Sequence, residues 1–339
     1  MGIRVIQYGT GFIGQKAIQL MTRQGYEVVA AIDTKGEHVG KDIGELANLG
    51  KKVGVKVADN PGDVLKKVPA DLVTMATVTK LEPLWPQLKP CLEAGLNVSS
   101  ISEELAYPWL RYPELAGEID ALAKAKNVTV VGSGVNPGLV MDLIPLTVAS
   151  SMWKVDKVSI SRVVDFGVYS PTRGTRRFGV TAAEFRAGVL AKQIPLHTGL
   201  FECLTMISET LGWKLDSITE TWESMISKSV RTTPWYTVQP GTTCGFRQTA
   251  VGSTNSETKI TLDIFCVVQP NLEEDGVEVG DIATISGEQS ITVKTVGGPT
   301  QRGDLVTTAR MVNIIPAVIE AKPGLLAVKD LPAAPPRVN

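Results

Sequence analysis

Two adjacent carboxylates stand in the segment ISEELAYPW, residues 101–109, where they could carry out proton transfer. Glu103 and Glu104 follow the apolar run NVSSIS, which is typical of a buried strand, and residues at the exits of such strands line ligand crevices. A glutamate there could deprotonate an amine or activate water, provided that burial raises its pKa toward the working pH. The alternative is an acidic first turn of a helix that begins near Leu105, which the helix dipole would stabilise.

Few other side chains compete with this pair as acid or base. The chain has two histidines, His38 and His197, so a cluster of histidine metal ligands is excluded and we predict no metal site. The cysteines are widely spaced and form no C-x-x-C pair, which predicts reduced core residues rather than a zinc or dithiol site. They are Cys91, Cys203, Cys244 and Cys266.

A glycine motif near the N-terminus predicts a dinucleotide site. The segment YGTGFIG has the G-x-G-x-x-G spacing and lies between a strand-like run, residues 3–9, and a helix-like run, residues 14–24. The glycines of such a motif permit a tight turn, close approach of a pyrophosphate and close packing of helix on strand, and the helix N-terminus binds the anion. The residues expected around the pyrophosphate are Gly9, Thr10, Gly11, Phe12, Ile13 and Gly14.

The next strand-like run, residues 26–33, ends in an acid where a ribose ligand is expected. Asp33 would accept a hydrogen bond from the ribose 2′-hydroxyl of NAD and repel the 2′-phosphate of NADP. Lys35, His38 and Lys41 follow it, and cations there could hold that phosphate. We therefore expect either NAD or NADP as the cofactor.

Two further strand ends are expected to neighbour the cofactor, because ligands of open α/β sheets bind at the carboxyl ends of the strands. Ala76, Thr77 and Thr79 follow one such run, and Asn136 lies in GSGVNPG after another. The alternative for the Asn-Pro-Gly sequence is ordinary turn chemistry.

The elements that must position these residues follow from the pattern of the whole chain. Strand-like and helix-like runs alternate through residues 1–145, which predicts an α/β domain with a parallel, doubly wound Rossmann sheet. Residues 146–302 change to longer runs of period two with helical stretches, which predicts an α+β domain for substrate and dimerisation with an open mixed sheet. We expect residues 303–339 to pack back on the first domain.

Composition argues against two classes of partner. Lysine and arginine total 34 against 35 acidic residues, a formal net charge of −1, so there is no basic field for nucleic acid or anionic lipid. No apolar stretch reaches the roughly 18 residues of a membrane span. We therefore expect a cytoplasmic protein whose partner is a small molecule.

Several motifs together resemble one family. YGTGFIG, ISEELAYPW, GSGVNPGLVMDLIP, LHTGLFECLTMISETLGW and MVNIIPAVIEAKPGLLAVKDLP are similar to the 2,4-diaminopentanoate dehydrogenases and native amine dehydrogenases of the dihydrodipicolinate reductase-like group. The resemblance spans nearly the whole chain. It implies NAD(P)-dependent oxidative deamination of 2,4-diaminopentanoate to 2-amino-4-oxopentanoate and ammonia in ornithine degradation. It also implies reductive amination of a ketone as the reverse reaction, and a homodimer.

The resemblance further implies that a glutamate of the E-E-L segment is the acid/base residue, with Glu104 slightly preferred to Glu103. Two departures separate the chain from neighbouring groups. It lacks the histidine pair and lysine of dihydrodipicolinate reductases, and it lacks the E-K-P lysine of similar sugar oxidoreductases. Two alternatives stay open: an amine dehydrogenase for simple ketones and amines, and a non-catalytic NAD(P)-binding sensor.

The implied substrate carries one carboxylate and two ammonium groups, so its pocket needs a cation. Arg173, Arg176 and Arg177 in SPTRGTRR could supply that cation, the alternative being a solvated loop. His197 precedes a helical stretch, where it could contact substrate or serve as a hydrogen bonder at the helix start.

Overall fold

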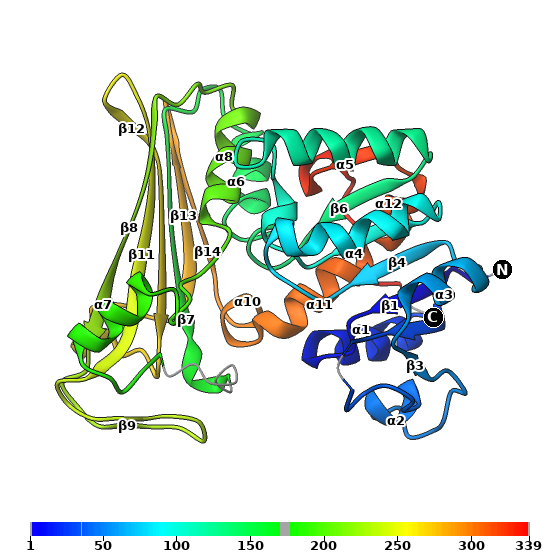
Figure 1. Cartoon of the computed structure of the whole chain (residues 1–339). Coiled ribbons are helices and arrows are strands. Elements are labelled where there is room, and N and C mark those ends of the chain that lie inside the picture. The colour runs from blue at the N-terminus through cyan, green and yellow to red at the C-terminus, as the bar shows by residue number, and fades with distance from the viewer. Residues whose placement is uncertain (1, 35, 170–176, 338–339) are drawn as a thin grey trace. The chain divides into compact units, whose positions relative to one another are not determined.

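Figure 1 traces the computed structural model. The residues that it describes are 2–34, 36–169 and 177–337. The chain divides into two compact units, one formed by residues 1–139 with 304–339 and the other by residues 140–303. The first change of unit thus falls after Leu139, slightly before the expected position at 145, and the C-terminal segment belongs to the first unit.

The first unit is built on a seven-stranded sheet in the order β15-β6-β5-β4-β1-β2-β3. Every neighbouring pair in this sheet is parallel, which confirms the predicted doubly wound α/β domain. Its strands are β1 (Arg4–Tyr8), β2 (Glu27–Ile32), β3 (Val57–Ala58), β4 (Leu72–Met75), β5 (Asn97–Ser100), β6 (Thr129–Gly132) and β15 (Gly324–Leu326).

Helices cover both faces of this sheet, which explains why its central strands are continuous apolar runs. All four residues of β4 are buried. On one face the buried core joins the sheet to α3 (Pro61–Lys67), α4 (Leu81–Glu93) and α5 (Pro113–Ala125). On the other face lie α1 (Phe12–Arg23), α11 (Gly303–Asn313) and α12 (Ile315–Glu320). Shorter elements are α2 (Ile43–Leu46), η1 (Glu104–Ala106) and η3 (Val328–Asp330).

The C-terminal segment completes the first unit. Strand β15 pairs with β6 at the edge of the sheet, with Gly324 opposite Thr129. The Ser99 hydroxyl of β5 donates a hydrogen bond of 2.8 Å to the carbonyl of Met311 in α11. These contacts join residues near the end of the chain to strands that support the candidate site.

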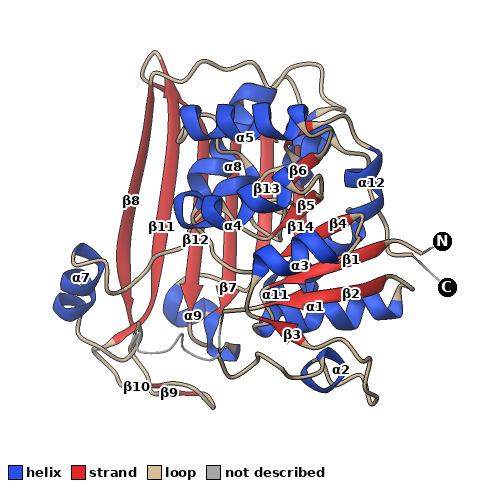
Figure 2. Ribbon diagram, turned by 45° about the vertical axis from the view of Figure 1, so that its right-hand side comes forward, coloured by secondary structure: helices blue, strands red, loops and turns tan. Residues whose placement is uncertain are grey.

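The second unit contains a six-stranded sheet in the order β14-β13-β7-β12-β11-β8, seen with strands coloured red in Figure 2. The pair β12 and β7 is parallel and the other pairs are antiparallel, which confirms the predicted open mixed sheet. Its strands are β7 (Lys157–Asp165), β8 (Ser217–Ile226), β11 (Thr243–Thr254), β12 (Glu257–Val267), β13 (Gly280–Ser286) and β14 (Ser290–Thr295); β9 (Arg231–Thr232) and β10 (Thr237–Val238) form a separate pair.

One face of the mixed sheet is buried and the other is only partly covered. In β12, for example, Ile260, Leu262 and Ile264 are fully buried, while the alternate Thr261 and Asp263 are partly exposed. The helices of this unit are α6 (Leu143–Ala149), α7 (Ala182–Leu190), α8 (Leu200–Thr210), α9 (Leu272–Asp275), α10 (Gly298–Gln301) and the short η2 (Phe166–Val168). Within the described ranges, no helix has both the length and the apolar character that crossing a membrane requires.

Candidate active site

Two positions in the turn between β1 and α1 can be occupied only by glycine. Gly9 has a φ of +88°, and a Cβ atom there would overlap the carbonyl of Ala76. A Cβ atom at Gly14 would overlap the carbonyl of Gly9. Helix α1 begins at Phe12 after Gly11, and no side chain caps its N-terminus. Its first N–H groups therefore form the type of site that binds a phosphate.

Asp33 is bound to the same turn at the end of β2. One carboxylate oxygen, Oδ2, accepts hydrogen bonds of 2.7 Å from both the backbone N–H and the hydroxyl of Thr10. The Thr10 hydroxyl also lies 2.9 Å from Nδ1 of His38, whose ring is 3.6 Å from Asp33. The predicted ribose ligand thus belongs to a Thr10–Asp33–His38 network. Of the other two predicted phosphate ligands, Lys35 lies outside the described residues and Lys41 is exposed.

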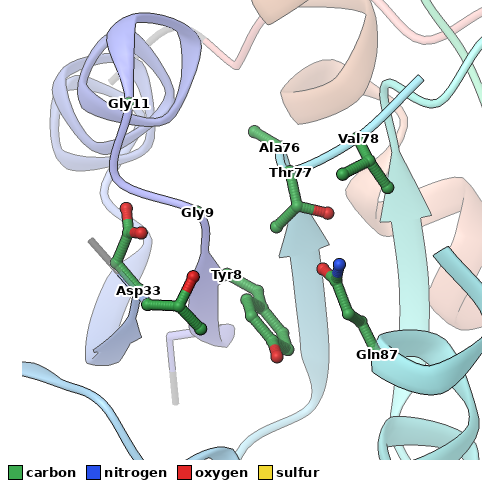
Figure 3. A pocket seen from close by; sticks show the side chains of 9 residues that line it. Tyr8, Gly9, Gly11, Asp33, Ala76, Thr77, Val78 and Gln87 are labelled. Atoms are coloured by element: carbon green, nitrogen blue, oxygen red, sulfur yellow. The ribbon is translucent and has the colours of Figure 1, made fainter. Parts of the chain in front are cut away.

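A pocket of about 250 Å³ opens at the carboxyl ends of β1, β2 and β4. In Figure 3, Asp33 lies on one side of it and Thr77 and Gln87 on the other, with the ring of Tyr8 between them. The Thr77 hydroxyl is buried and has no hydrogen-bond partner within the part of the chain that the structure describes. The lining residues are Tyr8, Gly9, Gly11, Asp33, Thr34, Ala76, Thr77, Val78 and Gln87.

These features fit a nicotinamide dinucleotide. The two glycines leave space for a pyrophosphate beside an uncapped helix N-terminus, and the Thr77 hydroxyl is an unused polar group inside the pocket. Gly9, Thr10, Gly11, Gly14, Asp33, Ala76 and Thr77 would hold the group. Ile13 is partly buried, and Phe12 is 64% exposed with Nζ of Lys16 4.6 Å from its ring centre.

Asn136 follows β6 at the same edge of the sheet and is buried, at 5% exposure. Its turn is tight, because Gly138 has a φ of +123° and a Cβ atom there would overlap the backbone of Gly134. Both interpretations of this segment, turn and cofactor neighbour, agree with this geometry.

The two adjacent glutamates have different surroundings. Glu104 is 4% exposed, and its Oε2 accepts hydrogen bonds of 2.8 Å from the backbone N–H of Leu81 and from the hydroxyl of Tyr112. Leu81 is the first residue of α4, so Glu104 satisfies an N–H group that the helix itself cannot. The carboxylate thus links η1, α4 and the start of α5. The predicted helix-start role applies to Glu104 twice, because Glu104 is the first residue of the short η1 and also accepts from the first residue of α4.

Glu103 is partly buried, and its carboxyl group forms a hydrogen bond with Thr79, the residue after Val78 of the pocket lining. Burial raises its pKa from 4.5 to about 7; a hydrogen bond from Thr79 opposes this shift and the charge of Glu104 adds to it. Thr79 is two residues after Thr77, and its carbonyl also accepts hydrogen bonds from the Ser102 hydroxyl and the Glu104 N–H. A carboxyl group with a pKa near 7 can both accept and release a proton at neutral pH.

The second unit contains the other predicted substrate residue, His197. Gln248 of β11 binds its backbone twice, accepting from the N–H at 3.0 Å and donating to the carbonyl at 2.9 Å. Burial lowers the pKa of His197 to about 3, with further lowering from the positive charges of Arg162 and Arg177, so the ring is neutral. Arg173 and Arg176 lie outside the described residues.

Sequence reasoning missed Tyr112, Gln87 and Gln248. Tyr112 lies in the predicted helix entry, Gln87 in a helix and Gln248 in a strand, and nothing in their local sequence distinguishes them from surface positions. Their roles depend on partners that are distant in the chain. Among the described residues, no group of three or more His, Cys, Asp or Glu side chains could hold a metal ion.

Comparison with known protein families defines the class of protein to which the chain belongs. Residues 3–98 match the family model of the dihydrodipicolinate reductase N-terminus, and residues 139–338 match that of the 2,4-diaminopentanoate dehydrogenase C-terminal domain. Together with the Rossmann sheet, these matches define an oxidoreductase that uses NAD(P) as its cofactor.

Individual relatives narrow the class. The chain is 33% identical to 2,4-diaminopentanoate dehydrogenase from Acetoanaerobium sticklandii, over 97% of this chain and 93% of the relative. It is 24% identical to an amine dehydrogenase from Streptomyces virginiae, over 98% and 97% of the two chains. The structure of amine dehydrogenase from Mycobacterium smegmatis superposes with a TM-score of 0.85 and 27% identity, covering 99% of this chain and 97% of that one. The chain belongs to the 2,4-diaminopentanoate dehydrogenase family, and it is an NAD(P)-dependent amine oxidoreductase.

Proposed function

We propose that the protein catalyses the NAD(P)-dependent oxidative deamination of 2,4-diaminopentanoate to 2-amino-4-oxopentanoate and ammonia. The reverse reaction is the reductive amination of the ketone. Identity of 33% across nearly the full length of a named 2,4-diaminopentanoate dehydrogenase supports this substrate. The reaction would serve ornithine degradation, as the resemblance implies. The observation that carries the chemistry is the Glu103 carboxyl group, which has a pKa of about 7 and forms a hydrogen bond with Thr79, the residue after Val78 of the pocket lining.

Gly9, Asp33 and Thr77 would hold the dinucleotide, which when bound would accept a hydride from the amine-bearing carbon of the substrate and would supply that hydride in the reverse reaction. Loss of that hydride leaves an iminium ion on the substrate. Ionised Glu103 then takes a proton from water as the water oxygen attacks the iminium carbon. Glu103 returns that proton to the nitrogen, and as the carbon–nitrogen bond breaks it takes up the proton of the new hydroxyl group, so that ammonia and the ketone are released. Thr79 orients Glu103 through its hydrogen bond.

This proposal assigns the two glutamates differently from the preference drawn from the motif. Both hydrogen bonds that the Glu104 carboxylate accepts from the described residues join its Oε2 to the start of α4 and to Tyr112. A carboxylate so engaged is suited to holding the position of the segment. We therefore infer that Glu103 is the acid/base residue and that Glu104 positions it.

A panel of amines assayed with NAD⁺ and with NADP⁺ tests the proposal. We expect the highest kcat/KM for 2,4-diaminopentanoate, with turnover supported by both cofactors. Higher kcat/KM for pentan-2-amine than for the diamino acid would instead identify a dehydrogenase for simple amines, which the similarity to the Mycobacterium smegmatis structure favours. No turnover of any amine, together with NAD(P)H binding, would identify a sensor.

We also propose a homodimer formed through the partly exposed face of the mixed sheet. Within the described residues, the helices that contact this sheet pack on its buried face, as Figure 1 shows for α6 and α8. The other face carries one row of neighbouring side chains from β8 to β14. The row is Thr221, Thr249, Asp263, Ser161, Ile282 and Lys294. A partly exposed sheet face of this kind is suited to packing against a second sheet.

A further inference from the structure

Arg177 precedes a segment that is fixed to the second unit by hydrogen bonds and by packing of aromatic rings. Two residues later, the N–H of Gly179 donates 2.8 Å to the carbonyl of Thr243 at the start of β11, and the N–H of Thr243 donates 2.8 Å to Val180. The intervening Phe178 is 3% exposed. Its ring packs edge-on against those of Phe166 and Tyr236, at centroid distances of 6.2 and 5.3 Å. The position of the Arg177 backbone is therefore fixed by the fold.

The guanidinium of Arg177 is half-buried and forms no hydrogen bond or ion pair with any of the described residues. The other buried arginines of this unit are compensated. Arg162 pairs with Asp281 at 2.8 Å, and Arg231 pairs with Glu274 and Asp275. Burial lowers the pKa of Arg177, the direction expected for a cation without a counter-ion. An anion from outside the chain would supply the counter-ion that the described residues do not.

His197 brings a second unused polar group to the same region. Its Nδ1 is buried without a hydrogen-bond partner among the described residues, although Gln248 fixes the backbone on both sides. The charges of Arg162 and Arg177 both act on this ring and on the thiol of Cys266. Gln248, Arg162 and Cys266 project from the buried face of the mixed sheet, which places the two unused groups over that face.

We propose that Arg177 binds the carboxylate of the amine substrate and that His197 contributes a hydrogen bond at Nδ1 to the same substrate. A guanidinium offers paired donors that match the two oxygens of a carboxylate. A neutral imidazole adds a donor or an acceptor without a second positive charge, which suits a substrate that also carries ammonium groups. The inference rests on the proposed function, and it makes Arg177 the residue that separates amino acid substrates from simple amines.

The experiment compares two substrates that differ only in the carboxylate, 2,4-diaminopentanoate and pentane-2,4-diamine. For Arg177→Met we expect kcat/KM for the diamino acid to fall at least about 30-fold, mainly through KM, because a desolvated charge pair is lost. For pentane-2,4-diamine we expect a change of less than about threefold. Arg177→Lys should lie between, since it keeps the charge and loses the paired geometry. Arg186→Met, at an exposed arginine of the same unit, is the matched control and should change neither substrate.

A binding measurement separates this inference from the proposed function. Calorimetric titration with 4-aminopentanoate should show binding to wild type and Arg186→Met and a loss of about 30-fold or more in Arg177→Met. If wild type does not oxidise 2,4-diaminopentanoate but binds 4-aminopentanoate through Arg177, the proposed function fails and the carboxylate site stands. Equal losses for both diamine substrates, or unchanged binding in Arg177→Met and Arg177→Lys, would overturn the inference.

Discussion

At the scale of single residues, Glu103 and Glu104 show how chain neighbours acquire different chemistry. Glu104 is held by the N–H of Leu81 and by Tyr112, whereas Glu103 is held by Thr79 beside the cofactor pocket. Burial raises the pKa of the Tyr112 phenol, as does its bond to Glu104, so Tyr112 remains a donor. One carboxylate is fixed by its partners, and the other is able to exchange a proton near neutral pH.

Glu103→Gln should lower kcat for deamination roughly 10²- to 10⁴-fold, because it removes a positioned general base. In wild type, the pKa of about 7 predicts that kcat for deamination rises with pH through 7 and then levels, since the ionised form acts as base. Glu104→Gln, the matched neighbour, should keep that pH profile and mainly lower thermal stability. Steady-state kinetics from pH 5 to pH 9 would decide the assignment. Loss of the pH profile in Glu104→Gln, with retention in Glu103→Gln, would reverse it.

The same pKa shift has a consequence for stability. Below pH 4.5 Glu103 is protonated in both the folded and the unfolded chain; as pH rises from 4.5 to about 7, the unfolded chain loses this proton first. Folding is therefore progressively disfavoured by Glu103 in this window. Glu103→Gln should raise Tm relative to wild type at pH 8 and leave it unchanged at pH 4. Differential scanning calorimetry at the two pH values measures this, and an equal shift at both would contradict the raised pKa.

Asp33 governs the choice between NAD and NADP in our interpretation. Asp33→Asn keeps an oxygen that accepts from Thr10 but removes the negative charge. The NADP-to-NAD ratio of kcat/KM should rise at least about tenfold, since like charges in contact cost more than 1 kcal/mol. Asp33→Glu keeps the charge and serves as control. An unchanged NADP-to-NAD ratio of kcat/KM in Asp33→Asn would show that the ribose 2′ position of the cofactor does not lie beside Asp33.

Local sequence predicted the cofactor site better than the substrate site, and the reason is physical. The glycine spacing and Asp33 act through the backbone and through their immediate neighbours, so a short motif contains the information. The roles of Glu103 and Glu104 depend on Tyr112, Leu81 and Thr79, which fold next to them from separate elements. Likewise, the sequence offered three arginines as carboxylate ligands, and the surroundings of Arg177 depend on Phe166, Tyr236 and Thr243, which are distant from it in the chain.

At the scale of elements, the β1–α1 turn depends on close contact between two backbones. Gly9→Ala should abolish measurable NADH binding, because the new Cβ would overlap the carbonyl of Ala76. Gly40→Ala is a matched control, since Gly40 has a similar φ of +80° and nothing lies within 4 Å of a Cβ there. Gly40→Ala should lower the free energy of unfolding only by the cost of the left-handed conformation for alanine, about 1–2 kcal/mol. NADH fluorescence titration and Tm measure both effects; similar NADH affinity in both variants would refute the overlap.

At the scale of the whole molecule, the homodimer that we propose depends on the partly exposed face of the mixed sheet. Val251→Glu places a charge on the partly exposed face that we propose as the dimer interface and should convert a dimer to a monomer. Leu190→Glu, at a position 67% exposed on α7, is the control and should leave the dimer intact. Light scattering after size exclusion gives both masses. A wild-type monomer, or a dimer that survives Val251→Glu, would exclude this interface.

The pairing of β15 with β6 also sets an order on events during translation. When the ribosome has made β6, the edge of the parallel sheet is ready for its last neighbour, but the residues of the second unit must be synthesised before Gly324 can reach Thr129. The inserted unit can fold as a continuous segment in the meantime. The cofactor domain is therefore begun first and finished last, and a nascent chain stalled before residue 324 exposes the unpaired edge of β6 to other strands.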